Sequence, residues 1–500
     1  MVSEQQGRLL SRRPADRFTG ALLALACGDA LGAPAEFLTK DQLASLHGRL
    51  EEMVGGGGHH WEPGEWTDDT GMTLCVAEGI LETPGEPVEA LGRRFIRWRR
   101  TAKDVGSTIS AALNGFDGNW GEASRNTPQA RMGKAAGNGS LMRTLPVALA
   151  YPDRAQMLRQ SARISAMTHW DPQAELACAV YCLWIRNLLE GQDITGAWGN
   201  ALEEGRSVES EGQRASDTPG PTPVPHIFWE RLETAHERSE NEIQPSGYAG
   251  YVLDCLEAVV WCCHQESTID EALIRAINLA GEADTIAAIA GGVLGTAYGP
   301  EGLRVSWLEK LFDKARLEDA GRRLAQLRHE HVYSSPGIPQ FSTYKVSAGL
   351  CGGRNPLTGL DVADLIESGV RRIIDLREEH EWTGPGRFGA EAVAAAEWCG
   401  LHRIHLPIRD GSAPASEDLD RTWKILHQDP VDASGAVYVH CRAGQERTGA
   451  ILVAHLARQK GLRYRESLGR LQKADCPIHL LPNQEWAVRQ WLKVHPGPES

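Results

Sequence analysis

The sequence has few of the features that mark a secreted or membrane-bound chain. Its 500 residues include no apolar run that we expect to be long enough and free enough of charge to cross a bilayer. Residues 1–17 include no apolar core of the secretory type. The 11 cysteines are odd in number and lack the short paired spacings of zinc sites. We therefore expect reduced thiols, a cytoplasmic protein and no membrane partner.

An excess of positive charge is also missing, because the net charge is −14. This balance argues against a general surface for nucleic acid or anionic lipid, although a local basic pocket stays compatible with it. Apolar residues make up 42% of the chain, as in ordinary globular proteins, and 500 residues are too many for one core. The chain is therefore expected to be multidomain.

Alternation of apolar and polar residues is scarce between residues 16 and 330, where the apolar spacing is mainly helical. We predict an all-α domain over residues 14–330, with helices at 18–31, 88–100, 156–167, 172–189, 248–263, 269–280 and 285–297. Residues 205–225 are rich in Ser, Pro, Gly and charge, which predicts a mobile insert in this domain.

The pattern changes after residue 330. Residues 331–343 are expected to be a linker, and residues 344–495 a small α/β domain with a central, largely parallel sheet. Strands are predicted at 370–376, 403–407 and 435–440, and they alternate with helices at 359–368, 391–399, 416–427 and 449–459.

The segment Glu65–Thr70 places a hydroxyl group beside two adjacent carboxylates, Asp68 and Asp69. Adjacent carboxylates repel each other unless a positive charge lies between them. Oxygen-only ligands of this kind suit Mg²⁺, Mn²⁺ or Ca²⁺ better than zinc. Taken alone, the same segment also fits the capped start of a helix with solvated carboxylates.

Four more segments bear on this pair of carboxylates. Residues 28–36 end a helix in a turn that carries Glu36. Residues 137–143 form a Gly-rich loop that can present backbone N–H groups to a phosphate. Thr168-His169 and residues 280–285 supply further polar groups, and the small residues that follow predict a helix packed tightly in the centre of the core.

Together and in this order, the segments GDALGAPAEF, WTDDT, GNGSLMR and ADTIAAIAGG resemble the ADP-ribosylglycohydrolase family, the relatives of dinitrogenase-reductase-activating glycohydrolase. The resemblance covers residues 16–330. It implies an all-α domain that holds two Mg²⁺ (or Mn²⁺) ions. It also implies hydrolysis of the glycosidic bond that joins ADP-ribose to an acceptor, either a protein or a small molecule.

Carried over position by position, the resemblance assigns metal ligands, diphosphate ligands and a ribose contact. The first metal would be bound by Thr67, Asp68, Asp69 and Asp284, and the second by Glu36, Glu282, Asp284 and Thr285. The diphosphate would be held by Gly139 and Ser140, and the ribose pocket would be lined by His169. The carboxylate that assists the attacking water would be Glu36 or Asp69, which the sequence does not separate.

The segment 280–285 departs from the pattern GGDTDT that is usual in this family. Glu282 adds a methylene group and Ala283 lacks a hydroxyl group, so the second metal site is in doubt. The alternative is an ADP-ribose-binding module that does not hydrolyse its ligand and instead targets an active phosphatase. Asp29 is equally well explained as a structural cap and is not assigned to the site.

The second chemical motif runs from His440 to Gly449, after a predicted strand and into a predicted helix. The helix N-terminus and Arg447 would both favour the thiolate form of Cys441, which is the nucleophilic form of the side chain. Arg447 can bind a phosphoryl group through two parallel hydrogen bonds. Thr448 is placed to stabilise the thiolate as a leaving group.

This H-C-x5-R-T-G segment resembles the Cys-dependent tyrosine and dual-specificity phosphatases, and the resemblance covers residues 344–491. It implies hydrolysis of a phosphate monoester through a phosphocysteine intermediate, with Arg442 and Gly444 in the phosphate-binding loop. Asp410 would be the general acid, and its alternative role is that of an ordinary turn residue before Gly411.

Glu446 departs from this second family, in which Gly is common at that position. An acid beside the phosphate disfavours highly anionic substrates, and Arg442 partly offsets it. A phosphorylated protein is therefore the first expected substrate, and a phosphorylated nucleotide or ADP-ribose derivative the second. The whole sequence predicts a bifunctional hydrolase, although an inert phosphatase-like domain or a non-enzymatic scaffold stays open.

Overall fold

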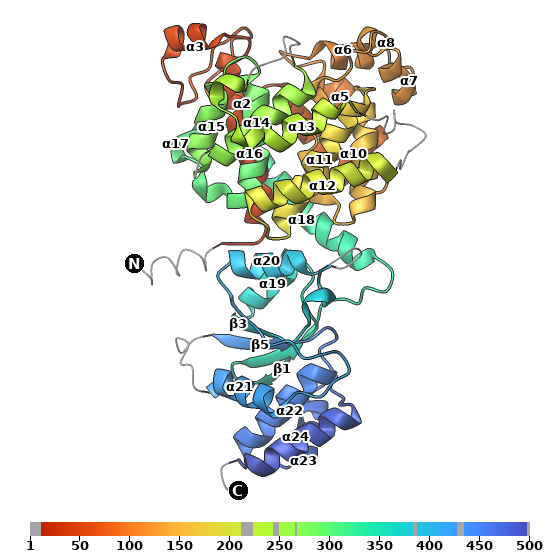
Figure 1. Ribbon diagram of the computed structural model, residues 1–500, viewed down its shortest axis with the longest axis vertical. Helices are drawn as coiled ribbons and strands as arrows, with labels where there is room; N and C mark the ends of the chain where they lie inside the picture. The colour runs from red at the N-terminus through yellow and green to blue at the C-terminus, as the bar shows by residue number, and fades with distance from the viewer. Residues whose placement is uncertain are drawn as a thin grey trace. The chain divides into compact units, whose positions relative to one another are not determined.

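The computed structural model describes residues 12–211, 224–243, 250–265, 268–383, 388–427 and 435–497 (Figure 1). The chain divides into two compact units. The first is Ala15–His331, and the second is Val332–Ser500 together with the residues before Ala15. Each unit has its own hydrophobic core.

The central helix of the first unit is α2 (Asp16–Gly32), which continues into the short 3₁₀ helix η1 (Ala33–Ala35). By length and composition, the segment Asp16–Ala35 is apolar enough to cross a membrane, so the expectation that the chain has no such segment is wrong. Within this segment, residues 17–35 are all buried inside the unit. Because its polar and apolar faces are both covered by protein, its sequence is that of a core helix.

Helix α16 (Ala283–Tyr298) packs against α2 backbone to backbone (Figure 1). A Cβ atom added at Gly28 would lie 2.2 Å from the carbonyl oxygen of Ala287, and one added at Gly291 would lie 2.2 Å from that of Ala24. Only glycine fits at these positions, as the small residues of this helix predicted. The close packing brings the end of α2 beside the beginning of α16.

The unit contains further helices, whose bounds are α3 (Lys40–His47), α4 (Asp68–Glu82), α5 (Val88–Trp98), α6 (Ser107–Asn114), α7 (Trp120–Arg125), α8 (Pro128–Arg131), α9 (Leu145–Ala150), α10 (Arg154–Ala166), α11 (Pro172–Leu189), α12 (Ile194–Glu211), α13 (His226–Thr234), α14 (Val252–Gln265), α15 (Ile269–Ile277), α17 (Val305–Lys310) and α18 (Lys314–Ser334). Short 3₁₀ helices lie at η2 (Asn138–Ser140), η3 (Ala235–Glu237), η4 (Glu240–Glu242) and η5 (Pro300–Gly302). The unit is helical, as predicted.

Two predicted segments differ from the observed elements. Helix α12 extends to Glu211, so the first part of the expected mobile insert at 205–225 is helical, and residues 212–223 lie outside the described residues. Helix α18 continues to Ser334, so the first residues of the expected linker at 331–343 belong to a helix.

The second unit contains a five-stranded sheet in the order β1-β2-β5-β3-β4. Only β1 (Thr343–Ser347) is antiparallel to its neighbour; β2 (Leu350–Gly353), β3 (Val370–Asp375), β4 (His402–His405) and β5 (Ala436–His440) are parallel. The predicted α/β class with a largely parallel sheet is confirmed. Parallel strands end at one edge, and there Asp375 of β3 is paired with His440 of β5.

Helices cover both faces of this sheet (Figure 1). One face packs against α19 (Gly359–Glu367) and α20 (Ala390–Trp398). The other packs against α21 (Ser416–His427), α22 (Glu446–Lys460), α23 (Tyr464–Lys473) and α24 (Pro482–Val494). A short 3₁₀ helix, η6 (Glu379–Glu381), follows β3 and supplies a residue to the site described below.

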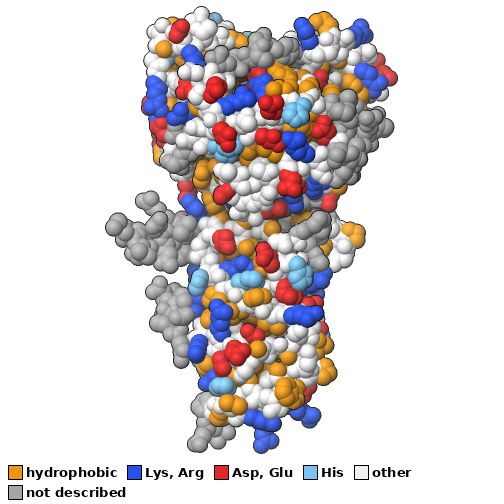
Figure 2. Space-filling model, in the orientation of Figure 1, with side chains coloured by type: hydrophobic (Ala, Val, Ile, Leu, Met, Phe, Trp, Pro, Cys, Tyr) orange, Lys and Arg blue, Asp and Glu red, His pale blue; other side chains and the backbone are white. Residues whose placement is uncertain are grey.

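Charged side chains of both signs are interspersed over the face drawn in Figure 2. The net charge of −14 is therefore not gathered into one patch on that face of the described residues. Such a mixed surface does not attract a polyanion by charge alone.

Candidate active sites

Three buried carboxylates meet where α2, α4 and α16 come together. Asp29 lies near the end of α2, Asp69 in the first turn of α4 and Asp284 in the first turn of α16. One oxygen atom from each lies within 4.8 Å of the others, and each side chain is at most 1% exposed. A cluster of this kind could bind a metal ion.

Asp29 also fixes the start of α4. Its carboxylate accepts hydrogen bonds from the backbone N–H groups of Thr67 and Thr70, both at 2.9 Å, and from the Thr70 hydroxyl at 2.6 Å. The interpretation of Asp29 as a cap is therefore supported, yet the same side chain lies in the carboxylate cluster. The sequence interpretation left it out because a cap and a ligand need the same residue type.

Asp69 has one oxygen atom that protein groups satisfy and one that they do not. Its Oδ2 accepts hydrogen bonds from the hydroxyl groups of Thr67 and Thr285, both at 3.2 Å. Its Oδ1 is buried and has no hydrogen-bond partner among the described residues. Because a buried carboxylate oxygen without a partner is costly, and because every donor here is oxygen, a hard cation such as Mg²⁺ or Mn²⁺ fits this site.

The carboxylates of this cluster hold their protons more tightly than usual. Burial raises the pKa of Asp29 to about 6, and burial with the nearby Asp104 raises the pKa of Asp68 to about 8. The pKa values of Asp69 and Asp284 are raised well above their ordinary range, first by burial and then by neighbouring carboxylates. The cluster therefore favours bound protons or a bound cation.

Glu36 lies beside this cluster, in a second group with His59 and Asp104. The three side chains are half-buried, and one ligand atom from each lies within 4.8 Å of the others. Burial and the nearby Asp284 raise the pKa of Glu36 to about 11. His59 and Asp104 were missed in the sequence; His59 follows the Gly-rich run 55–58, whereas Asp104 carries no local signal.

Glu282, the residue that departs from the family pattern, faces the Gly-rich loop. Its Oε2 accepts a hydrogen bond from the side-chain amide of Asn138 at 3.1 Å. Burial raises its pKa. Glu282 does not belong to either of the two groups of potential ligands among the described residues, and Ala283, which follows it, is buried at the start of α16.

The predicted diphosphate loop contains η2, and its side chains turn inward. The Ser140 hydroxyl accepts a hydrogen bond from the Ser165 hydroxyl at 2.9 Å and is fully buried. Ser140 would therefore contribute a backbone N–H group rather than its hydroxyl to a ligand. Gly139 lies against the ring of His169, so that a Cβ atom there would be 3.0 Å from Cε1 of the ring. The structure thus brings Gly139, Ser140 and His169 together.

A cavity of about 490 Å³ opens beside Thr67 and Asp68. It is walled by the rings of Trp61, Trp66, Trp98 and Phe312, and its polar lining includes Glu65, Asp104, Arg97 and Lys103. It offers aromatic faces and charges of both signs next to the carboxylate cluster.

In the second unit, the loop between β5 and α22 carries Cys441, which is 3% exposed. Gly444 has a φ angle of +72°, and a Cβ atom at this position would lie 2.2 Å from the carbonyl oxygen of Gly353. No other residue fits this turn without moving the backbone. Arg442, in the same loop, has an exposed side chain.

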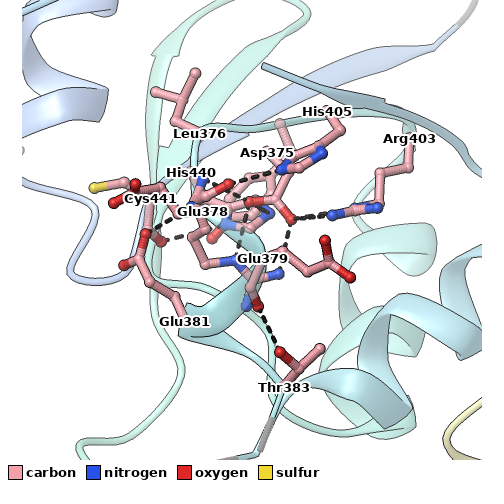
Figure 3. Close-up of polar contacts among 12 residues, drawn as sticks. Asp375, Leu376, Glu378, Glu379, Glu381, Thr383, Arg403, His405, His440 and Cys441 are labelled. Carbon is pink, nitrogen blue, oxygen red and sulfur yellow. Dashed lines mark hydrogen bonds and ion pairs between the residues drawn. The ribbon is translucent and has the colours of Figure 1, made fainter. Parts of the chain in front are cut away.

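Arg447 is held in place by Glu381 of η6, which is labelled in Figure 3. Its Nη1 and Nη2 atoms donate to the two carboxylate oxygens of Glu381 at 2.6 and 2.7 Å, and Nη1 also donates to the carbonyl of Ile408 at 3.0 Å. Burial raises the pKa of Glu381, but the hydrogen bonds from Arg447 outweigh it and lower this pKa below the ordinary value. The guanidinium is therefore fixed by a protein carboxylate.

Asp410 lies against the same guanidinium, with its Oδ1 at 3.0 Å from Nη2 of Arg447. Its backbone N–H donates to the Glu378 carboxylate at 3.2 Å, and the next residue, Gly411, accepts from the side-chain amide of Asn483 at 3.0 Å. Because its side chain is 64% exposed, Asp410 can reach a ligand at the mouth of the loop.

Thr448 and Glu446 complete the loop. The Thr448 hydroxyl is buried and has no hydrogen-bond partner among the described residues. Glu446 lies 3.2 Å from Nε2 of His479. His479 is therefore a neighbour of the acid that departs from the family pattern.

Asp375 forms a buried ionic cluster behind the loop (Figure 3). Its Oδ2 accepts hydrogen bonds from Arg377 at 2.8 Å and from Arg403 at 2.9 Å. His440 lies 3.7 Å from its Oδ1, and the rings of Trp382 and the two guanidinium groups stack at 4.7–4.8 Å. The sequence interpretation did not single out this residue, although a carboxylate that follows five apolar or basic residues at the end of a strand is a signal for it.

The first unit is similar to several known proteins. The model of the ADP-ribosylglycohydrolase family matches residues 10–332. ADP-ribosylarginine hydrolase Tri1 of Serratia proteamaculans is 28% identical over 328 residues, which are 64% of this chain and 81% of that protein. ADP-ribosyl-[dinitrogen reductase] glycohydrolase of Rhodospirillum rubrum is 30% identical over 312 residues, covering 61% of this chain and 92% of that protein.

A solved structure and a second family model complete the comparison. The structure of an ADP-ribosylglycohydrolase-related protein complex superposes with a TM-score of 0.51 at 29% identity, covering 63% of this chain and 99% of that chain. In the second unit, residues 349–461 match the model of the DSP-PTPase phosphatase of polymorphic toxin systems. The C-terminal unit is therefore a phosphatase domain of this kind.

Proposed function

Because the chain belongs to the ADP-ribosylglycohydrolase family, we propose that its first unit cleaves the glycosidic bond between ADP-ribose and an acceptor. The observation that carries the proposal is the unpartnered Oδ1 of Asp69 within a cluster of buried carboxylates. Two Mg²⁺ or Mn²⁺ ions, when bound, would orient the ribose hydroxyls and stabilise charge as the bond breaks.

The chain's own groups would divide the remaining tasks. The metal ligands would be Thr67, Asp68, Asp69, Glu36, Glu282, Asp284 and Thr285, and we add Asp29 to this set. Backbone N–H groups of Gly139 and Ser140 would hold the diphosphate. Burial and the nearby acids raise the pKa of Glu36 to about 11. Glu36 would take the proton of the attacking water, and bound cations would favour the ionised form that this role needs.

The acceptor would lie in the cavity beside Asp68. Arginine is the first acceptor to test, because a relative is named as an ADP-ribosylarginine hydrolase. A guanidinium group suits a cavity that combines tryptophan faces with Glu65 and Asp104. A small-molecule acceptor would use the same cavity.

Release of free ADP-ribose tests this proposal. We expect release from a mixed ADP-ribosylated protein substrate with Mg²⁺, no release with EDTA, and no release by Asp284→Ala. Release that survives both EDTA and Asp284→Ala would contradict metal-dependent hydrolysis.

A second candidate for this unit is an ADP-ribose reader without turnover. The hydrogen bond between Glu282 and Asn138 favours it, because the loop engages one oxygen of this carboxylate. ADP-ribose binding without release of product, with turnover gained in the double variant Glu282→Asp, Ala283→Thr, would support the reader.

For the second unit we propose hydrolysis of a phosphate monoester. The thiolate of Cys441 attacks phosphorus, the ester P–O bond breaks, and Asp410 gives its proton to the leaving oxygen. In the second step Asp410 takes a proton from water, which attacks phosphorus and breaks the S–P bond. The hydroxyl of Thr448, which lacks a partner, donates a hydrogen bond to the departing thiolate.

Arg447 would bind the phosphate in both steps. Since Asp410 contacts its Nη2 atom, the Asp410 carboxylate must turn toward the leaving oxygen when a substrate enters. Turnover of a small aryl phosphate, abolished by Cys441→Ser, is the expected result. A folded wild type that hydrolyses no phosphate monoester would contradict the proposal.

We further propose that both domains remove modifications from one target or one pool of substrates. A phosphorylated protein is the first substrate to test for the phosphatase domain, and a phosphorylated nucleotide or ADP-ribose derivative is the second. Two activities that share no substrate in cells would argue against a common target.

A further inference from the structure

Arg143 is a charged side chain in the core of the first unit. It is 0% exposed, and its guanidinium carbon lies 4.8 Å from the centre of the Phe95 ring. It forms no salt bridge with a carboxylate among the described residues, and burial lowers its pKa only to about 10, so it stays charged at neutral pH. Burying a cation without an anionic partner is energetically unfavourable, so the hydrogen bonds of Arg143 are expected to have a structural or functional role.

Those hydrogen bonds lead to His169. Nη2 of Arg143 donates to the Thr168 hydroxyl at 2.7 Å and to the carbonyl of Ile164 at 3.2 Å. The same hydroxyl lies 2.8 Å from Nδ1 of His169. Arg143, Thr168 and His169 thus form one chain of hydrogen bonds, and all three side chains are at most 2% exposed.

The direction of this chain follows from the chemistry of its members. A guanidinium only donates, so the Thr168 oxygen accepts from Arg143. The proton of the Thr168 hydroxyl then needs an acceptor, and His169 Nδ1 is the acceptor that the described residues offer. Nδ1 must therefore be unprotonated, and the proton of a neutral imidazole must lie on Nε2.

The position of the His169 ring places its Nε2 atom beside the Gly-rich loop. A Cβ atom added at Gly137 would lie 3.0 Å from Nε2 of His169, and one added at Gly139 would lie 3.2 Å from it. The Nε2 atom has no hydrogen-bond partner among the described residues, and it lies along the loop proposed to hold the diphosphate. Because neither glycine has a side chain, the backbone of this loop lies close to the Nε2 edge of the ring.

We infer that Arg143 and Thr168 are positioning residues that fix His169 as a neutral imidazole, whose Nε2–H donates a hydrogen bond to a diphosphate or ribose oxygen of ADP-ribose. The choice of ligand rests on the proposed function of this unit, whereas the tautomer does not. Burial, followed by the charge of Arg143, lowers the pKa of His169 to about 3. The ring therefore stays neutral at pH values near neutrality.

The variants Thr168→Val and Thr168→Ser in the full chain test this inference. Valine keeps the shape of threonine but has no hydroxyl, and serine keeps the hydroxyl. The tautomer of His169 is read from ¹⁵N shifts of ¹⁵N-histidine-labelled protein, with His169→Gln identifying its signals. ADP-ribose binding is measured by calorimetry, and thermal unfolding confirms that each variant is folded.

We expect one tautomer, Nε2–H, in the wild type and in Thr168→Ser, and a mixture in Thr168→Val. The loss of one oriented hydrogen bond should weaken ADP-ribose binding by about tenfold in Thr168→Val and leave Thr168→Ser close to wild type. In turnover, KM should rise by about the same factor and kcat should stay nearly unchanged, as for an interaction made equally in the ground and transition states.

Two results would overturn the inference. One is a wild-type His169 with its proton on Nδ1, which is measurable even where the Thr168→Val variant does not fold. The other is a Thr168→Val variant that binds ADP-ribose as tightly as the wild type. A wild type with the expected tautomer that neither binds ADP-ribose nor releases it would overturn the proposed function and leave the hydrogen-bond chain standing.

Discussion

The carboxylate of Asp410 lies 3.0 Å from the guanidinium of Arg447, although the aspartate is 64% exposed and the arginine 2% exposed. Glu381 holds the same guanidinium from the buried side. Arg447 is therefore shared between a fixed carboxylate and an exposed one. Under the proposed mechanism, a phosphate that enters the loop would compete with Asp410 for Arg447 and would release Asp410 to face the leaving group.

The variant Asp410→Asn tests the acid role. We expect kcat for an aryl phosphate with a poor leaving group to fall by roughly 10²–10⁴-fold, because the leaving oxygen then receives no proton. A leaving group that is stable as an anion needs no such proton. For a substrate with such a leaving group, kcat of the variant should therefore fall much less. A series of substituted phenyl phosphates measures the difference, and equal losses along the series would contradict the assignment.

The variant Glu381→Gln tests the support of Arg447. The amide keeps the size of the side chain but removes the charge that fixes the guanidinium, so kcat/KM should fall by about a hundredfold through misplacement. Glu379→Gln on the same 3₁₀ helix is a matched control, because no contact with Arg447 involves Glu379 among the described residues. Equal activity of both variants would remove Glu381 from the mechanism.

The double variant Glu282→Asp, Ala283→Thr introduces the Asp and Thr of the family pattern at these two positions. Shortening the acid would free Asn138 and bring the carboxylate back toward the metal site, so we expect about tenfold tighter binding of Mn²⁺ at the weaker site. Calorimetric titration of the metal measures the change, and Glu282→Gln is the matched control that should weaken binding. Unchanged affinity in the double variant would show that the added methylene group of Glu282 and the missing hydroxyl group of Ala283 do not impair the metal site.

His440 makes the phosphatase domain sensitive to acid. Burial lowers its pKa to about 4, despite the opposing charge of Asp375. Between this value and the ordinary 6.5 the unfolded chain binds the proton and the folded domain does not, so stability falls as pH falls. Between pH 6.5 and pH 4, the free energy of unfolding should fall by about 3 kcal/mol in total for a pKa shift of this size.

Calorimetric unfolding of wild type and His440→Asn at several pH values measures this loss. His455, whose buried ring also has its pKa lowered to about 4, contributes in the same direction and remains in the variant. Asp375 has its pKa held far below 3.8 by nearby cations despite burial, and its contribution disappears only below pH 3.8. The difference between the two proteins therefore isolates His440, and parallel pH curves would contradict the prediction.

The variant Gly28→Ala tests the packing of α2 against α16. A methyl group at 2.2 Å from a backbone oxygen forces the helices apart, so the free energy of unfolding should fall by about 1–3 kcal/mol or more. Gly199→Ala in α12 is the matched control, because a Cβ atom there meets nothing within 4 Å. It should be neutral or stabilising by roughly 0.5–1 kcal/mol, and thermal unfolding compares the two.

The sequence correctly predicted those helices and strands whose own residue pattern is enough to specify them. Helix α11 begins and ends at the predicted residues, since Asp171 caps it and Pro172 occupies its first turn. Strands β1 and β2 were missed because Thr343–Ser347 is an exposed edge strand and Leu350–Gly353 is short and ends in glycine. Strand β1 pairs with β2, and β2 joins the sheet through β5, which lies far along the chain.

In the two candidate sites, too, some residues could be predicted from the sequence and others could not. The motifs around Asp68 and Cys441 could be predicted, because the chemistry needs those residue types at short spacing. The residues that support them were not: Asp104 meets Glu36, and Glu381 meets Arg447, through packing between distant segments. No periodicity or local motif predicts such partners, so they are found only in the folded chain.

The backbone contact between α2 and α16 also has a consequence for how this protein is made. The two helices are separated by about 250 residues, and α2 leaves the ribosome first. At roughly 5–20 residues per second, α2 waits on the order of ten to fifty seconds for the helix that covers it. During synthesis, this apolar segment therefore stays without its main packing partner until α16 has emerged.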